Sequence, residues 1–544
     1  MRVSAKDAPN GTVTGVQPIP SSDEELNPHR WMIMIGLITA TILQVLDSTV
    51  VNVALPQMAG NLSATTEEIG WVATGYILSS VIVLPMTAWL SGRFGRKRYL
   101  TGSILLFITA SFFCGTSRTL PELVFWRVIQ GVGGAALLST AQATLREIFP
   151  LEQQGMVQAI FMMGVMVAPT VGPTLGGYIT DNYNWPWIFF INIPIGLFSA
   201  GMVYAFLHDS PYQKRALSID WWGIGLLAVG MGCLQYVLEE GNRDDWFDSS
   251  TIVILSVVSS IALIGLLAWE LSPWNQHPIV NFRVLKNRDL AAGSFLFVAL
   301  GFGLYGGMFI FPLFAQDILH FTPTLTGMTM MPGAAATAVS VMVCGKLFTP
   351  GRQLVPGRIL IFFGLAVFIF SMWILGHLSS TSAAPNVQLG LIVRGIGLGF
   401  LSAPINLSAL STLRGSAISE GTALMNLMRQ LGGSFGIAVL GTYVTNNTNV
   451  HRAALIAHVS PVNPVYQHTL MHITHELQAN GLTFIAAQKA AFGLIAQMLD
   501  IQTITMSYND AFLLIGMTCL FVSPTIFLLR NRLPVGTHTV EISE

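Results

Sequence analysis

Charged residues are scarce in this chain. Lys, Arg, Asp and Glu make up 10% of its 544 residues, whereas soluble domains carry about 25%. Hydrophobic residues make up 52%, and the mean hydropathy is +0.61. These values predict an integral membrane protein. Because the net charge is −1, the chain lacks the basic excess of a nucleic-acid-binding protein, and no nucleic-acid partner is expected.

Cysteine is also rare, and one common nucleotide-binding motif is missing. The four cysteines lie in apolar runs at unrelated spacings, so the sequence predicts neither a disulfide framework nor a metal site; they are Cys114, Cys233, Cys344 and Cys519. No Gly-x-x-x-x-Gly-Lys-Ser/Thr loop occurs, which argues against an ATP-driven pump. We therefore expect no metal and no organic cofactor.

Long apolar runs fill most of the sequence. A helix needs about 20 apolar residues to cross a bilayer. On this rule the sequence predicts an all-α membrane protein with about fourteen spans, at approximately 31–51, 69–90, 99–117, 123–145, 156–179, 187–207, 219–239, 250–271, 290–312, 325–347, 357–378, 386–412, 420–445 and 507–530.

Basic residues alternate between the loops and set the topology. Loops placed in the cytoplasm hold clusters such as Arg93 to Arg98, whereas the intervening loops hold few Lys or Arg. By the positive-inside rule, both termini are cytoplasmic. The predicted parts are a cytoplasmic tail (1–30), a six-helix bundle (31–207), a linker with two extra spans (208–288), a second six-helix bundle (289–530) and a cytoplasmic tail (531–544).

The second bundle contains a long external segment, 446–506. Leu482 to Leu499 is partly apolar but interrupted by Gln and Lys, so we expect an interfacial amphipathic helix and not a fifteenth span. His468, His472 and His475 would share one face of a helix. A solvated polar face explains them better than a metal site or a pH sensor. External segments of this length are usually functional.

Asp47 is the one acidic residue deep inside a clean apolar span. A carboxylate there costs about 2.5–3.5 kcal/mol and indicates a proton or substrate site. Counting 1.5 Å per residue puts Asp47 roughly 24 Å from the inner face and Arg127 roughly 9 Å below the outer face. In a core of about 30 Å the two are level. A proton on Asp47 would release Arg127, which is a switch; the alternative is a permanently ionised structural pair.

Three glycine-rich motifs accompany this pair. The span at 156–179 carries Gly164, Ala168, Gly172 and Gly176 at four-residue spacing with Pro169 and Pro173, which favours close helix packing and bending. The loop Arg93-Phe-Gly95-Arg96-Lys97 can hold helix ends and lipid phosphates, although topology signalling alone explains most single residues. Arg127 to Gly133 recurs loosely as Arg394 to Gly399, as expected for repeated halves.

Several segments resemble one family in the same order. Leu46-Asp47 to Pro56 resembles the first-span signature of fourteen-span drug:proton antiporters of the EmrB/QacA type, within the major facilitator superfamily. The other matching segments are Arg127 to Gly134, Ala168 to Gly177, Trp187 to Gly196, and Arg429 to Ser434. The resemblance covers nearly all of 31–530 and is closest to Gram-negative inner-membrane subunits. Ala88 and Gly92 depart from the family's loop motif, so its cytoplasmic latch is weakened here or supplied elsewhere.

The resemblance implies a fold of two six-helix bundles plus two extra helices, and a secondary transporter in place of an enzyme. It implies proton-driven efflux of amphipathic organic compounds from the cytoplasm across the bacterial inner membrane by alternating access, with a periplasmic adaptor and an outer-membrane channel as partners. On the same resemblance, we expect segment 446–506 to contribute to docking of the adaptor. Asp47 and Arg127 would couple protons, and Ala168 to Gly177 would carry the conformational motif. Asn52, Gln130, Asn426 and Arg429 are candidates to line the substrate path. The alternatives are a membrane sensor or scaffold and an uptake symporter.

Overall fold

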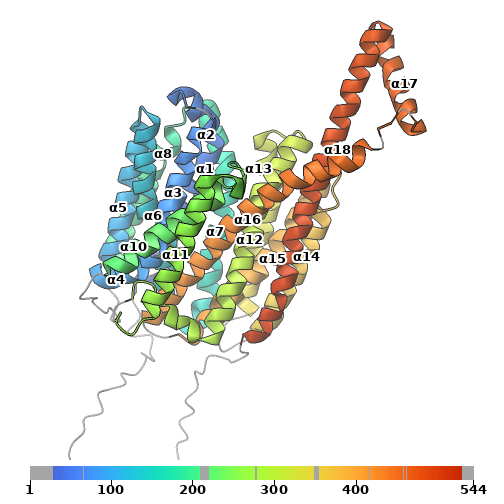
Figure 1. Cartoon of the computed structure of the whole chain (residues 1–544). Coiled ribbons are helices and arrows are strands. Elements are labelled where there is room, and N and C mark those ends of the chain that lie inside the picture. The colour runs from blue at the N-terminus through green and yellow to red at the C-terminus, as the bar shows by residue number, and fades with distance from the viewer. Residues whose placement is uncertain are drawn as a thin grey trace, which may run out of the picture.

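The computed structural model describes residues 28–64, 66–208, 220–275, 278–347, 355–413, 416–457, 459–460 and 462–529, and every regular element within them is a helix (Figure 1). The predicted tails at 1–30 and 531–544 lie almost entirely outside these residues. Helices run roughly parallel or antiparallel along one direction, as apolar spans must when each buries its backbone polar groups internally.

The first half of the bundle is built from the first nine helices. The short α2 (Thr66–Ile69) links α1 to α3, and a 3₁₀ turn (Leu84–Met86) joins α3 to α4 into one span. The other elements are α1 (Arg30–Leu62), α3 (Trp71–Val83), α4 (Thr87–Phe94), α5 (Arg96–Thr116), α6 (Leu120–Ile148), α7 (Leu151–Asn182), α8 (Trp187–Phe190) and α9 (Asn192–Phe206).

Two further helices, α10 (Trp221–Glu240) and α11 (Ser250–Leu271), follow the first half and pack against each other, with α10 contacting α3 and α16. The second half then comprises α12 (Arg288–Leu313), α13 (Pro323–Leu347), α14 (Gly357–Leu375), α15 (Ala384–Leu410), α16 (Ser416–Ile456), α17 (Pro464–Ala479) and α18 (Phe484–Val522).

The number of spans follows from helix length, composition and packing. Within the described residues, twelve helical stretches are long and apolar enough to cross a membrane. The helices α7, 32 residues long, and α16, 41 residues long, lie in the same bundle: α7 packs against α1 and α13, and α16 packs against α12. Twelve and two give fourteen, so the predicted fold class is confirmed.

The two halves repeat one packing plan. Contacts of α6 with α1, α3 and α5 match contacts of α15 with α12, α13 and α14. Contacts of α1 with α7 and α9 likewise match those of α12 with α16 and α18. This pseudo-symmetry pairs α1 with α12 and α6 with α15, which places Asp47 and Arg127 on helices whose counterparts can be compared directly.

The halves meet closely at one end of the bundle, which we call the basic end because the Arg93 to Arg98 cluster and the start of α12 lie there. Gln142 on α6 accepts a hydrogen bond from Asn426 on α16 at 3.0 Å. Gln158 on α7 donates one to Asn406 on α15 at 3.4 Å. One apolar cluster also joins both halves there; its members include Phe149, Val157, Leu290, Leu410 and Met425. The protein is therefore closed at the basic end.

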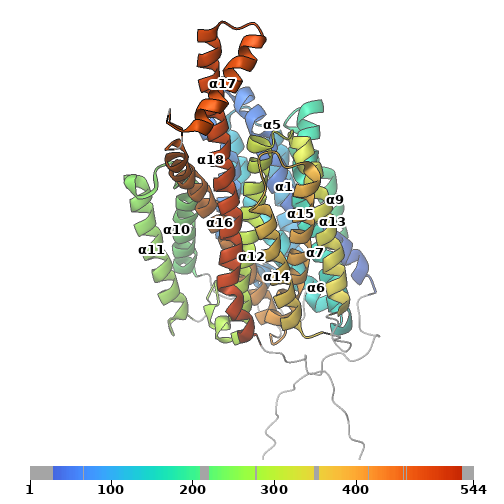
Figure 2. The same ribbon diagram turned by 90° about the vertical axis from the view of Figure 1, so that its right-hand side faces the viewer.

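The predicted interfacial helix at Leu482 to Leu499 is wrong. Phe484 to Leu499 belong to α18, a continuous helix of 39 residues that also forms the last span. At 1.5 Å per residue α16 and α18 are each about 60 Å long, twice a hydrocarbon core of about 30 Å. Helix α17 and the outer part of α18 form a helical hairpin, residues 464–500, that projects from the end opposite the basic end (Figures 1 and 2). Polar residues interrupt the pattern because the hairpin leaves the bundle.

Candidate functional site

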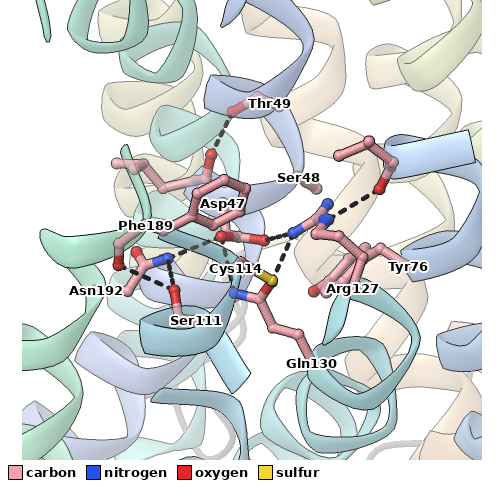
Figure 3. Close-up of polar contacts among 12 residues, drawn as sticks. Asp47, Ser48, Thr49, Tyr76, Ser111, Cys114, Arg127, Gln130, Phe189 and Asn192 are labelled. Carbon is pink, nitrogen blue, oxygen red and sulfur yellow. Dashed lines mark hydrogen bonds and ion pairs between the residues drawn. The ribbon is translucent and has the colours of Figure 1, made fainter. Parts of the chain in front are cut away.

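Asp47 lies on α1 at the centre of a buried polar network (Figure 3). Its Oδ2 accepts a hydrogen bond from Nη1 of Arg127 at 2.7 Å. Its Oδ1 accepts two more, from Nδ2 of Asn192 at 2.8 Å and from Nε2 of Gln130 at 3.1 Å. Three donors from α6 and α9 thus hold the ionised carboxylate, which offsets the cost of removing it from water.

Arg127 reaches Asp47 from α6 and is fixed on every side. Its Nε donates to the carbonyl of Val72 on α3 at 2.9 Å, and its Nη1 also donates to Oε1 of Gln130 at 2.7 Å. The guanidinium carbon lies 4.4 Å from the centroid of the Tyr76 ring, a cation–π contact. Asp47 and Arg127, predicted to lie at the same depth, therefore form a direct ion pair. The pair links α1 to α6, and the Val72 carbonyl adds α3.

Water has no access to this network in the closed structure. Asp47 and Arg127 are each 1% exposed, and Gln130 and Asn192 are 0% exposed. The Tyr76 hydroxyl lies buried beside the pair with no hydrogen-bond partner in the described part of the chain. In this conformation the Asp47 carboxylate is therefore shielded from solvent.

Three members of the network are not predicted from the sequence: Asn192, Ser111 and Tyr76. Asn192 donates to Asp47 and also to the Ser111 hydroxyl at 3.0 Å, and Ser111 donates in turn to the Phe189 carbonyl at 2.9 Å (Figure 3). The sequence does contain a signal for Asn192, because an Asn in an apolar run needs hydrogen-bond partners. In the sequence, Asn192 stands out only as part of the family signature Trp187 to Gly196.

The glycine stripe of α7 lies against α1 beside Asp47. A Cβ at Gly172 would overlap the Thr49 hydroxyl, and one at Gly176 would come 2.9 Å from the Val50 carbonyl oxygen. Ala168 is buried. Helix α7 runs unbroken from Leu151 to Asn182 despite its prolines. The side chains of Pro169 and Pro173 lie outside those that the structure describes, and Gly177 is half-buried on the same helix.

The four candidates to line the substrate path occupy different settings. Gln130 belongs to the Asp47 network. Asn426 is buried and bonds across the halves to Gln142. Arg429 is buried on α16, and its Nε has no hydrogen-bond partner among the described residues. The side chain of Asn52 is not among those that the structure describes.

The loop motif ties α5 to its neighbours within the first half. Gly95, at φ 87°, ends α4 and precedes α5 in a conformation that suits glycine. Arg96 forms a two-point ion pair with Glu147 at the end of α6, at 2.5 and 2.8 Å. Lys97 lies over the Tyr204 ring at 4.9 Å, while Arg93 is exposed. The predicted clasp of helix ends is therefore present as Arg96–Glu147.

Comparison with known proteins agrees with this architecture. The family model for the Major Facilitator Superfamily matches residues 37–437. The multidrug export protein EmrB of Haemophilus influenzae is 32% identical over 509 residues, which are 93% of this chain and 96% of that protein. EmrB of Escherichia coli K12 is 33% identical over 484 residues, covering 88% and 91% of the two chains.

A solved structure shares the fold. The proton:xylose symporter XylE matches 92% of this chain and 95% of its own with a TM-score of 0.58 at 12% sequence identity. That likeness concerns the fold alone, whereas the EmrB matches are close enough in sequence to define a family. The chain therefore belongs to the major facilitator superfamily and, within it, to the family of EmrB-type multidrug export proteins.

Proposed function

We propose that this protein exports amphipathic organic compounds from the cytoplasm in exchange for protons, as a secondary antiporter of the bacterial inner membrane with both termini in the cytoplasm. Membership of the EmrB-type family supports export, because those relatives are named multidrug export proteins. The charge pattern of the loops supports the orientation. On this reading the basic end faces the cytoplasm and the hairpin faces the periplasm.

One observation carries the coupling role: Asp47 is a carboxylate held by a cation and two amides at full burial. Adding a proton to Asp47 neutralises the carboxylate and so removes its electrostatic attraction to Arg127. The protonated carboxyl group also accepts fewer hydrogen bonds than the carboxylate. The network then loosens, and α1 and α6 are free to move relative to each other. Such a change in a buried pair has two discrete states, which a transport cycle requires.

Helix α7 provides a route from this site to the other half. It packs against α1 through Gly172 and Gly176 and against α13 through Thr174, which lies directly against Gly327. Movement of α1 beside Asp47 therefore displaces a helix that both halves share. Rocking of the halves would open the basic end and close the opposite one, which is alternating access.

Efflux measured in inverted membrane vesicles under an imposed pH gradient tests the proposal. Wild-type protein is expected to transport a fluorescent amphipathic dye when the gradient is applied, and Asp47→Asn is expected to lose gradient-driven transport. Asp248→Asn, at an exposed residue outside the network, serves as the matched control and should transport normally. Gradient-driven efflux by Asp47→Asn would remove Asp47 from the coupling role.

Two alternatives are separated by the same assay. A sensor or scaffold would move no dye under any gradient, although a scaffold has no evident use for a buried ion pair. An uptake symporter would move substrate in the same direction as the protons. The direction of dye movement relative to the proton gradient therefore distinguishes antiport from symport.

We propose further that the projecting hairpin docks a periplasmic adaptor, which passes substrate to an outer-membrane channel. Apolar side chains are exposed on it: Val465 is 73% exposed, Ile485 70% and Met471 64%. A deletion of 446–506 would cut α16 and α18, so point changes are the sharper test. Val465→Asp with Ile485→Asp should abolish co-purification of the adaptor, whereas His472→Asp, at an exposed polar position of α17, should not. Unchanged co-purification would contradict this docking role.

A further inference from the structure

Arg394 is a buried cation on α15 that pairs with no carboxylate among the described residues. It is 5% exposed, and its Nη2 donates a hydrogen bond to the Leu304 carbonyl on α12 at 2.9 Å. Its Nε has no partner within the described residues. No Asp or Glu occurs in the sequence between Asp289 and Asp317, or between Asp317 and Glu420. The interior of α12, α13, α14 and α15 therefore offers it no counter-ion.

The pseudo-symmetry shows what is missing. Gly133 lies against Phe107 on α5, and Gly397 lies against Phe368 on α14. If Gly133 and Gly397 are equivalent positions, Arg394 is equivalent to Gln130. The sequence repeat instead aligns Arg394 with Arg127, one helical turn away.

On α12, the counterpart of α1, Gly307 lies beside Arg394. Gln130 donates to the Asp47 carboxylate in the first half. In the second half, a Cβ at Gly307 would come 2.8 Å from Nη2 of Arg394. The first half thus holds a cation with its carboxylate, whereas the second holds a cation facing a glycine.

A small cavity of about 40 Å³ adjoins Arg394. About 10–15 Å³ of such space holds one water molecule, so the cavity accepts a group the size of a carboxylate and not a whole drug-sized molecule. Gly333, Ala334 and Gly395 leave this space open. Apolar side chains form most of the remaining wall: Leu304, Met308, Met330, Leu391 and Leu398.

The chemistry of the cavity selects an anion. A guanidinium stays charged at all relevant pH values and offers several donors in one plane, which suits a carboxylate. Arg394 lies ten residues into α15, roughly 15 Å from its start and near the middle of a core of about 30 Å. A charge at that depth is retained where it meets a partner or a transported group.

We infer that Arg394 and its cavity form a binding subsite for the carboxylate of an amphipathic organic acid, whose apolar body lies beyond the cavity, past the Met and Leu side chains of its wall. This inference rests on the proposed export function and assigns it a class of substrate, organic anions. In the second half the substrate itself provides the carboxylate that Asp47 provides in the first.

Equilibrium binding to the full-length protein in lipid nanodiscs tests the subsite. The probes are 2-naphthoate and 2-naphthamide, which share one apolar body and differ in charge. Wild-type protein is expected to bind the carboxylate at least tenfold more tightly than the amide. Arg394→Gln should reduce that ratio to about one with little change for the amide, and Arg394→Lys should keep part of the preference.

Two further variants make the test independent of simple misfolding. Gly307→Asp places a carboxylate beside Arg394, so it should also abolish the preference for naphthoate. Arg452→Gln removes an exposed cation of the second half and should leave the ratio unchanged. A naphthoate preference that persists in Arg394→Gln and Gly307→Asp would overturn the subsite.

The same probes separate failure of this inference from failure of the proposed function. Dye efflux in vesicles without any preference for naphthoate over naphthamide would overturn the anion subsite and leave export standing. Loss of dye efflux in the wild type itself would overturn export, whatever the probes do.

Discussion

Gly172 on α7 packs directly against Thr49 on α1, two residues from Asp47. The contact leaves no room for a side chain, and the Thr49 hydroxyl donates to the Leu46 carbonyl at 2.9 Å within its own helix. The stripe that the sequence predicted for close packing thus lies beside the ion pair, and any shift of α1 there is felt by α7.

We expect Gly172→Ala to lower both stability and transport. The added methyl group must displace Thr49, and overpacking of this kind typically costs about 1–3 kcal/mol. Thermal unfolding of the purified protein and dye efflux in vesicles measure the two effects. Thr49→Ala removes the hydroxyl and should rescue Gly172→Ala, whereas Gly102→Ala, where nothing lies within 4 Å of the new Cβ, should change neither. A Gly172→Ala protein with unchanged stability and transport would show that the close contact between α7 and α1 is not required.

The Asp47–Arg127 pair should separate stability from transport in a double-variant cycle. Removing one partner of a buried pair costs about 3–5 kcal/mol because it leaves the other charge uncompensated, whereas removing both can be nearly neutral. Asp47→Asn should therefore lower the melting temperature more than Asp47→Asn with Arg127→Gln. Both proteins should fail in pH-driven efflux. A double variant that regains stability and also transports would mean that the pair is only structural.

Asn192 should matter to the same network although its own side chain is neutral. Asn192→Leu leaves Oδ1 of Asp47 and the Ser111 hydroxyl each short of one hydrogen bond, and a buried group left unsatisfied costs about 1–3 kcal/mol. We expect a lower melting temperature and slower efflux. Asn182→Leu, at an exposed position near the end of α7, is the control. Equal melting temperatures for the two variants would contradict a supporting role for Asn192.

The Arg96–Glu147 pair should be restored by charge reversal. Glu147→Arg leaves two cations facing each other where α5 begins and α6 ends, both largely buried. We expect a marked loss of folded protein. Arg96→Glu combined with Glu147→Arg should recover part of the yield, as judged by size-exclusion chromatography in detergent. If the double variant behaves no better than the single one, the pair does not hold these helix ends together.

The sequence predicted the bundle well because the bilayer imposes one rule on every span. Apolar length and loop charge were sufficient for fourteen helices, and the rise per residue was sufficient to place Asp47 level with Arg127. The partner Asn192 could not be located in the same way, because the rotation of α9 against α1 depends on packing and not on depth.

Two predictions failed for physical reasons. The segment Leu482 to Leu499 is predicted to be an interfacial helix because an amphipathic pattern does not distinguish a helix lying on a membrane from one leaving it. Arg394 was aligned with Arg127 because several glycine spacings fit equally well in one dimension. The contacts of Gly133 and Gly397 with their neighbours show that the correct alignment of α6 with α15 differs from the sequence alignment by one turn.

Closure at the basic end yields a prediction about movement. Gln142 and Asn426 touch across the halves in this structure, and alternating access requires that contact to break. Cysteines at both positions, joined by a short bifunctional thiol reagent, should lock the basic end and stop dye efflux, and a reducible reagent should allow recovery. Cysteines at Thr448 and Ser507, which touch within the second half at 3.1 Å, should cross-link without stopping efflux, because rocking moves that half as a unit. Continued efflux in the fully cross-linked Gln142–Asn426 protein would contradict opening at this end.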